Sequence, residues 1–116
     1  MAGLSADHVR RGDIALVVGG IYASKPRPAV VIQDDLFDCT DSVIVCPLTS
    51  SEVDAPLLRV AVPANDQTGV AVESFLMVDK LTAIRRKNVG RPFGRLPRSQ
   101  MVELERRIVV LLGLAS

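Results

Sequence analysis

The sequence predicts a small α+β domain, mainly β, in which a curled antiparallel sheet or barrel is followed by one helix. Short runs of β-branched and apolar residues, separated by Gly, Pro, Asp and Asn, recur along most of the chain. Near the end the spacing becomes helical, because Met101, Leu104, Ile108 and Leu111 lie three, four and three positions apart. The 116 residues fit one ordinary domain. We therefore expect residues 1–116 to form a single domain with a polar, flexible leader over 1–9.

Six segments are predicted as strands because each is a short apolar or alternating run bounded by turn residues: 14–18, 29–32, 42–48, 57–62, 73–78 and 81–84. The polar turn at 65–69 predicts that the two segments around it pair with each other. Residues 22–28 are predicted as a loop, since Pro26 and Pro28 remove two backbone donors. Pro47 predicts an edge or bulge position in its strand.

The last segment predicts one helix of about 14 residues that follows Pro97 and stops at Gly113. Val102, Val109 and Leu112 lie on the rows beside the main apolar stripe. The stripe is therefore wide, and only part of it need face the domain's own core. The remainder is available for a contact with a second chain.

Composition excludes several classes of protein. No uninterrupted apolar run is longer than that at 108–112, which is far shorter than the roughly 20 residues of a membrane-spanning helix. The first six residues have neither a basic nor an apolar region, so we do not expect them to form a secretory signal. Aromatic residues make up only 3% of the chain. Folds that bind single-stranded nucleic acid by stacking several bases on aromatic side chains are therefore disfavoured. We expect a soluble, cytoplasmic protein that is not bound to a membrane.

The two cysteines do not predict a metal site. Cys39 and Cys46 form no CxxC motif, and the only histidine, His8, is distant in sequence. Cys46 lies within an apolar run, which favours core packing, although a single disulfide with Cys39 stays geometrically possible. We expect no metal and no cofactor.

The charges are unevenly distributed although the net charge is only +1. Residues 1–79 carry five basic and eleven acidic side chains, a balance of −6, whereas residues 80–116 carry nine and two, a balance of +7. Five of the basic residues fall within 85–95. Such a run is either a solvated loop or a face that attracts phosphate.

Three motifs precede the helix in a fixed order: R-G-D-I at 11–14, R-P-A-V-V-I at 27–32 and V-I-V-C-P-L-T-S at 43–50. In sequence, order and spacing they resemble motifs of the MazF/PemK family of toxin endoribonucleases. The resemblance spans about residues 9–114. It implies an SH3-like barrel of antiparallel strands with a C-terminal helix. It also implies a homodimer that cuts single-stranded RNA by attack of the ribose 2′-OH, without a metal, and that is inhibited by a cognate antitoxin.

The resemblance implies roles for particular residues. Arg27 is expected to hold the phosphate as charge builds on it, because a guanidinium stays charged and offers fixed donors. Thr49 is expected to donate a hydrogen bond to the same phosphate, and Asp79 to orient Arg27 or accept a proton. The alternatives are a surface arginine, an ordinary turn and a solvated carboxylate. The residues expected to bind RNA are Lys25, Ser50, Lys80, Arg85 and Arg86.

Two other functions stay open on the sequence alone. A toxin of similar fold that acts on DNA gyrase, as CcdB does, is one of them. That class is characterised by a Trp-Gly-Ile ending, whereas this chain has no Trp and ends with Leu-Ala-Ser. The other is a barrel that binds RNA but no longer cleaves it.

Overall fold

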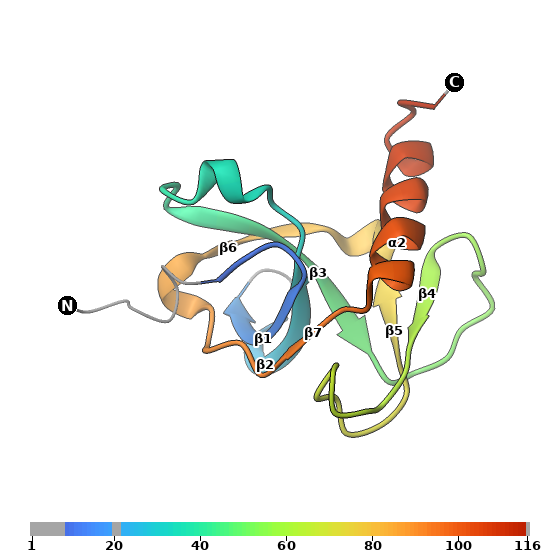
Figure 1. Ribbon diagram of the computed structural model, residues 1–116, viewed down its shortest axis with the longest axis horizontal. Coiled ribbons are helices and arrows are strands. Elements are labelled where there is room, and N and C mark those ends of the chain that lie inside the picture. The colour runs from blue at the N-terminus through green and yellow to red at the C-terminus, as the bar shows by residue number, and fades with distance from the viewer. Residues whose placement is uncertain (1–8, 20–21, 116) are drawn as a thin grey trace.

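The computed structural model describes residues 9–19 and 22–115, and the main chain forms a curved antiparallel sheet with one α-helix beside it (Figure 1). Short 3₁₀ turns, η1 (Asp35–Phe37), η2 (Val78–Lys80) and η3 (Arg86–Asn88), lie between strands. The strands and the helix are β1 (Asp13–Gly19), β2 (Tyr22–Val31), β3 (Ser42–Thr49), β4 (Arg59–Val62), β5 (Ser74–Met77), β6 (Thr82–Arg85), β7 (Gly94–Arg95) and α2 (Arg98–Leu111).

The sheet follows the order β4-β5-β3-β2-β1-β7, and β6 pairs with β3 in addition. Strand β3 is the centre of this arrangement because it changes partner along its length. On one side it pairs with β2; on the other it pairs with β6 through residues 42–45 and with β5 through residues 48–49. The sheet therefore divides at β3 into two curled parts, which gives the half-barrel seen in Figure 1. The mainly β, antiparallel fold class with a C-terminal helix is confirmed.

The prediction of a loop over residues 22–28 is wrong, because this segment forms the first part of β2. Its register pairs with β1 include Pro28 with Leu16, whereas the pairing with β3 begins only at Ala29. Along this stretch β2 therefore has a partner on one side, a position where proline is tolerated. Pro47 is buried inside the sheet, at the point where β3 passes from β6 to β5, and not at a free edge. The short strand β7 was not predicted.

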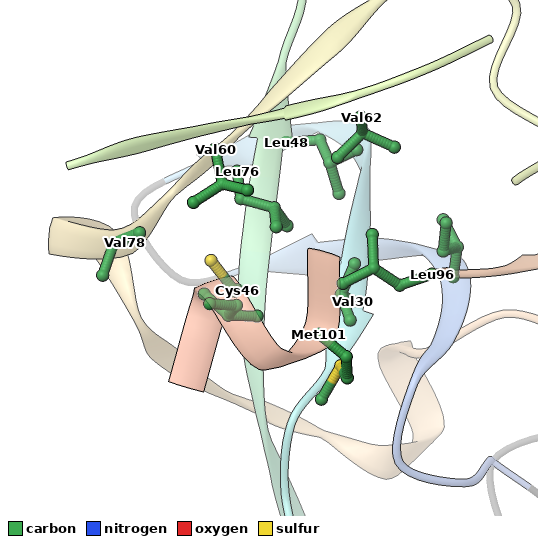
Figure 2. Close-up of a cluster of buried hydrophobic side chains, with 11 residues drawn as sticks. Val30, Cys46, Leu48, Val60, Val62, Leu76, Val78, Leu96 and Met101 are labelled. Atoms are coloured by element: carbon green, nitrogen blue, oxygen red, sulfur yellow. The ribbon is translucent and has the colours of Figure 1, made fainter. Parts of the chain in front are cut away.

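Over part of their length, strands β1, β2 and β3 bury both of their faces, because alternate residues enter two different apolar clusters. Ile14, Val30 and Cys46 belong to a cluster that α2 closes with Met101 and Leu104. Figure 2 shows Val30, Cys46 and Met101 of this cluster gathered between the helix and the strands. The residues between them on the strands enter a second cluster on the other face, which also includes Val9. This burial on both faces explains why the three segments are continuous apolar runs.

Helix α2 has the predicted length of 14 residues. Its last residue is Leu111, and Gly113, whose φ is +74° and whose N–H donates to the Val110 carbonyl at 3.0 Å, forms the C-terminal cap. Part of the stripe faces outward, with Leu111 at 41% and Leu112 at 57% exposed. Among the described residues no helix is long and apolar enough to cross a membrane.

The expectations for the leader and the cysteines have mixed outcomes. Val9 is buried and is not part of a flexible leader, whereas residues 1–8, with His8, lie outside the described residues. Cys46 is a core residue, as predicted, and its thiol donates to the Met77 carbonyl at 3.4 Å. Neither cysteine is in a disulfide.

Candidate functional site

A pocket of about 280 Å³ lies where β2 and β3 separate, and it contains three of the predicted site residues. Arg27 lines it from β2, and Thr49 and Ser50 line it from the end of β3. Its remaining lining residues come from β1, β2 and β3, from the segment before β5 with the first residue of β5, and from the segment before β7. They comprise Leu16, Pro28, Leu48, Gly69, Val70, Ala71, Val72, Ser74 and Phe93.

The division of the sheet places Arg27 and Thr49 in this pocket. The register pairs of β2 and β3 end at Ala29 and Pro47, and beyond them β3 pairs with β5, where Thr49 lies opposite Phe75. Arg27 and Thr49 are each two residues past that last pair, on strands that separate there. Polar side chains therefore reach a pocket at the seam of the half-barrel and not the apolar core.

Both side chains can bind an anion. The Arg27 guanidinium is partly exposed and carries five N–H donors in a planar fork. The Thr49 hydroxyl accepts a hydrogen bond from the Ser51 backbone N–H at 3.1 Å. An accepting hydroxyl keeps its own hydrogen for donation. Lys25 is exposed and lies two residues from Arg27 on β2, so the strand alternation places both on one face.

The wall opposite these residues is fixed by two close backbone approaches. A Cβ on Gly94 would lie 1.9 Å from the Thr68 carbonyl oxygen, so only glycine fits there. A Cβ on Gly69 would lie 2.8 Å from the Phe93 ring, and the φ of +71° also favours glycine. The Arg95 N–H donates to the Gln67 carbonyl at 2.8 Å. The 67–72 segment and the 93–95 segment are thus held against each other.

Asp79 and Lys80 lie outside this pocket, in η2. The Asp79 carboxylate binds Arg59 at 2.7 Å and the Lys80 ammonium at 3.4 Å. Partial burial acts to raise the pKa of Asp79, but the hydrogen bond from Arg59, the backbone hydrogen bond and the two positive charges outweigh it. The pKa of Asp79 is therefore below its ordinary value of 3.8. Its carboxylate is engaged with Arg59 and is not brought to the pocket of Arg27.

Arg85 and Arg86 lie at the other end of β3. Arg85 pairs with Ser42, which is seven residues, or roughly 23 Å of strand, from Thr49. The side chain of Arg86 is buried, and its guanidinium donates to the Phe37 carbonyl at 3.1 Å and to the Thr40 carbonyl. We therefore correct the expectation for Arg86, because its donors hold the 37–40 loop. Arg85 is exposed beside Lys87, on a surface separate from the pocket.

Sequence reasoning missed the apolar wall of the pocket. Val72 and Phe93 are distant in sequence from the motifs, and only the turn glycine at 69 marks the segment as unusual. Within residues 9–19 and 22–115, no three His, Cys, Asp or Glu side chains gather closely enough to hold a metal ion.

A half-barrel sheet with a C-terminal helix is the fold that the resemblance of the three motifs implied. Residues 10–112 match the sequence-family model of the PemK-like, MazF-like toxins of type II toxin–antitoxin systems. The chain therefore belongs to this family. A probable endoribonuclease MazF of Mycolicibacterium smegmatis is 45% identical over 92% of this chain and 99% of its own length. Endoribonuclease MazF9 of Mycobacterium tuberculosis is 27% identical over 93% of this chain and 99% of its own length.

Solved structures share the fold at low sequence identity. A mycobacterial endoribonuclease in complex with its cognate antitoxin superimposes with a TM-score of 0.77 at 18% identity, covering 91% of this chain and 96% of that one. MazF in a MazE–MazF complex of Deinococcus radiodurans superimposes with a TM-score of 0.76 at 22% identity, covering 90% and 96%. The half-barrel is therefore the fold of these toxins.

Proposed function

We propose that this chain is the toxin of a type II toxin–antitoxin system and cleaves single-stranded RNA at a short recognition sequence. The observation that carries the proposal is the shared pocket of Arg27 and Thr49, on β2 and β3, in a chain of the MazF-like family. Two of its relatives are named as endoribonucleases, which supports the same activity for this chain.

The proposed reaction is a transesterification. The ribose 2′-oxygen attacks the neighbouring phosphorus, its proton passes to a base, and the bond to the 5′-oxygen breaks as that oxygen gains a proton. Negative charge builds on the non-bridging oxygens in the transition state. Arg27 stabilises that charge with charge-assisted hydrogen bonds, and Thr49 donates a neutral one. Ser50 and Lys25 bind the backbone on either side, and no general base is assigned.

Asp79 has no direct part in this proposal, because its carboxylate is engaged by Arg59 and Lys80 outside the pocket. Lys80 and Arg85 are exposed enough to bind the RNA backbone outside the pocket, but no step depends on them. RNA-binding side chains of this kind add affinity that falls as salt rises.

Incubation of the purified protein with end-labelled RNA in excess chelator tests the activity. Cuts at discrete positions support a sequence-specific, metal-independent endoribonuclease. Retardation of the RNA without cuts indicates a barrel that only binds RNA. If RNA is neither bound nor cut, the proposed function is wrong and a protein target such as gyrase becomes the better candidate.

We also propose that the chain forms a homodimer and binds a cognate antitoxin. The apolar residues exposed at the end of α2, which include Val110, Leu112 and Leu114, support a contact with a second copy. Antitoxin complexes among the structural neighbours support the second partner. RNA as substrate favours the cytoplasm as the place of action. Sedimentation at micromolar concentration that shows only a 12.5 kDa species contradicts the dimer.

A further inference from the structure

The proposed phosphate chemistry uses only the polar side of the pocket. Its other lining includes three apolar side chains that are partly open to solvent: Leu16 at 47%, Val72 at 56% and Phe93 at 41% exposed. They come from three separate segments, and they offer a phosphate neither a hydrogen bond nor a positive charge. An apolar wall beside a phosphate site fits a ligand that carries a phosphate and a flat ring with apolar faces, and a nucleotide has both.

Phe93 is the one aromatic residue among the described side chains that line this pocket. The other two phenylalanines are elsewhere: Phe37 lies in η1, and Phe75 lines a different cavity, beside Arg59. The low aromatic content of the chain therefore does not exclude stacking at this position, because a single ring suffices for one base.

The backbone holds the Phe93 ring in place before any ligand binds. The Phe93 N–H donates to the Ile14 carbonyl at 2.8 Å, which ties the residue to β1. The ring lies against Gly69, where a Cβ would be only 2.8 Å from the Phe93 Cδ1 atom. The next residue, Gly94, fits against the Thr68 backbone. A ring fixed in this way loses little conformational freedom when a base stacks on it.

We propose that Phe93 stacks against the base of a nucleotide next to the scissile phosphate, while Arg27 and Thr49 hold that phosphate. This inference rests on the proposed function of the pocket. Base–aromatic stacking tolerates every base because each has a π-face. Phe93 therefore fixes the position of the RNA in the pocket, and the edges of the stacked base stay open to recognition by other groups.

The first experiment uses fluorescence, since the chain has no tryptophan. Phe93→Trp places a single reporter in the pocket, and Phe37→Trp, at a residue 56% exposed in η1, is the matched control. The probe is a 2′-O-methyl RNA, which lacks the attacking hydroxyl and is not cut. We expect quenching of the Phe93→Trp signal on titration and no quenching in the control. Binding of the probe without quenching at position 93 overturns the proposal.

The second experiment measures cleavage. Phe93→Leu keeps an apolar side chain but removes the ring, and we expect kcat/KM to fall by about tenfold to a hundredfold. Phe93→Tyr should keep nearly the wild-type value. On RNAs with an abasic site at the nucleotide that stacks, wild type and Phe93→Leu should cleave at the same reduced rate.

The outcomes separate the stacking proposal from the proposed function. If wild type cleaves RNA and Phe93→Leu cleaves equally well, stacking is wrong and the function stands. If the loss in Phe93→Leu persists on every abasic substrate, the residue is structural and the proposal is overturned. If wild type cuts no RNA but the probe quenches Phe93→Trp, the pocket binds a base and the proposed function fails.

Discussion

Arg27 and Thr49 each lie two residues beyond the last register pair of β2 and β3, Ala29 with Pro47, and both line one pocket. The two residues are separated in the sequence by the whole β2–β3 connection. They meet because β3 leaves β2 at this point to pair with β5. The separation of β2 from β3 thus forms a pocket in which polar side chains of both strands lie close together.

Arg27→Ala is expected to reduce single-turnover cleavage by about 10² to 10³, because it removes a charge-assisted contact that strengthens in the transition state. Arg27→Lys should recover little of the loss, since an ammonium cannot form the same fork. The thermal midpoint serves as the control and should barely change for a side chain at a pocket. A parental rate with an unchanged melt rejects the assigned role, and unfolding shows that Arg27 is structural.

Thr49→Val is expected to have a smaller effect. The substitution keeps the shape and removes one neutral hydrogen bond, worth roughly 0.5–1.5 kcal/mol, or about threefold to tenfold in rate. Single-turnover cleavage of the same RNA measures it. A loss as large as that of Arg27→Ala would contradict the assignment of a single neutral hydrogen bond to Thr49.

Gly94→Ala is expected to destabilise the protein by about 3 kcal/mol, because its Cβ would meet the Thr68 carbonyl at 1.9 Å and the backbone must shift. Gly113→Ala is the comparison. It has a positive φ but nothing within 4 Å of the added atom, so we expect about 1 kcal/mol. Urea unfolding measures both. Equal losses would show that the 67–72 and 93–95 segments are not held as tightly as the geometry indicates.

Arg86→Met is expected to cost about 1–3 kcal/mol, since it leaves the Phe37 and Thr40 carbonyls without their charged donor. Arg85→Met, on the adjacent exposed residue, should leave stability unchanged. Neither change should alter the single-turnover rate of cleavage at saturating RNA. If Arg86→Met instead keeps its stability but loses RNA binding, the assignment of Arg86 to the 37–40 loop is wrong.

The pairing of Asp79 with Arg59 predicts a pH-dependent contribution to stability. Because the folded pKa of Asp79 is lowered, its carboxylate stabilises the fold above the unfolded value of about 3.9, and the stabilisation is lost as pH falls through the folded pKa. Asp79→Asn should therefore lower the melting temperature at pH 7, and the difference from wild type should shrink below about pH 4. Glu73→Gln, at an exposed residue, is the control. A difference independent of pH contradicts this account.

The two cysteines are expected to differ in reactivity. Burial raises the pKa of the Cys46 thiol to about 12, and the charge of Asp79 adds to the effect, whereas Cys39 is exposed. Iodoacetamide should label Cys39 in the native protein and Cys46 only after unfolding. Mass spectrometry of digested samples distinguishes the two, and rapid native labelling of Cys46 would contradict its place in the core.

Much of the fold follows from local patterns. The runs that form β1, β3 and β5 and the spacing that forms α2 are predictable because each segment must bury an apolar face, and its period reveals which structure can do so. Gly113 ends the helix for an equally local reason, its positive φ. Residues 22–28 were mispredicted because proline lacks a backbone N–H. Its presence destabilises a strand only where a neighbouring strand would accept a hydrogen bond at that position, and the sequence does not show this.

The family motifs, and with them the choice of Arg27 and Thr49, can be identified from short stretches of the chain. Which other residues lie beside them depends on contacts between segments that are distant in the sequence. Asp79 forms an ion pair with Arg59, Arg86 donates hydrogen bonds to the 37–40 loop, and Phe93 lines the pocket. A charge or a ring in a sequence has no fixed partner, because its contacts depend on where β3 divides the sheet and on two glycines that let distant backbones touch.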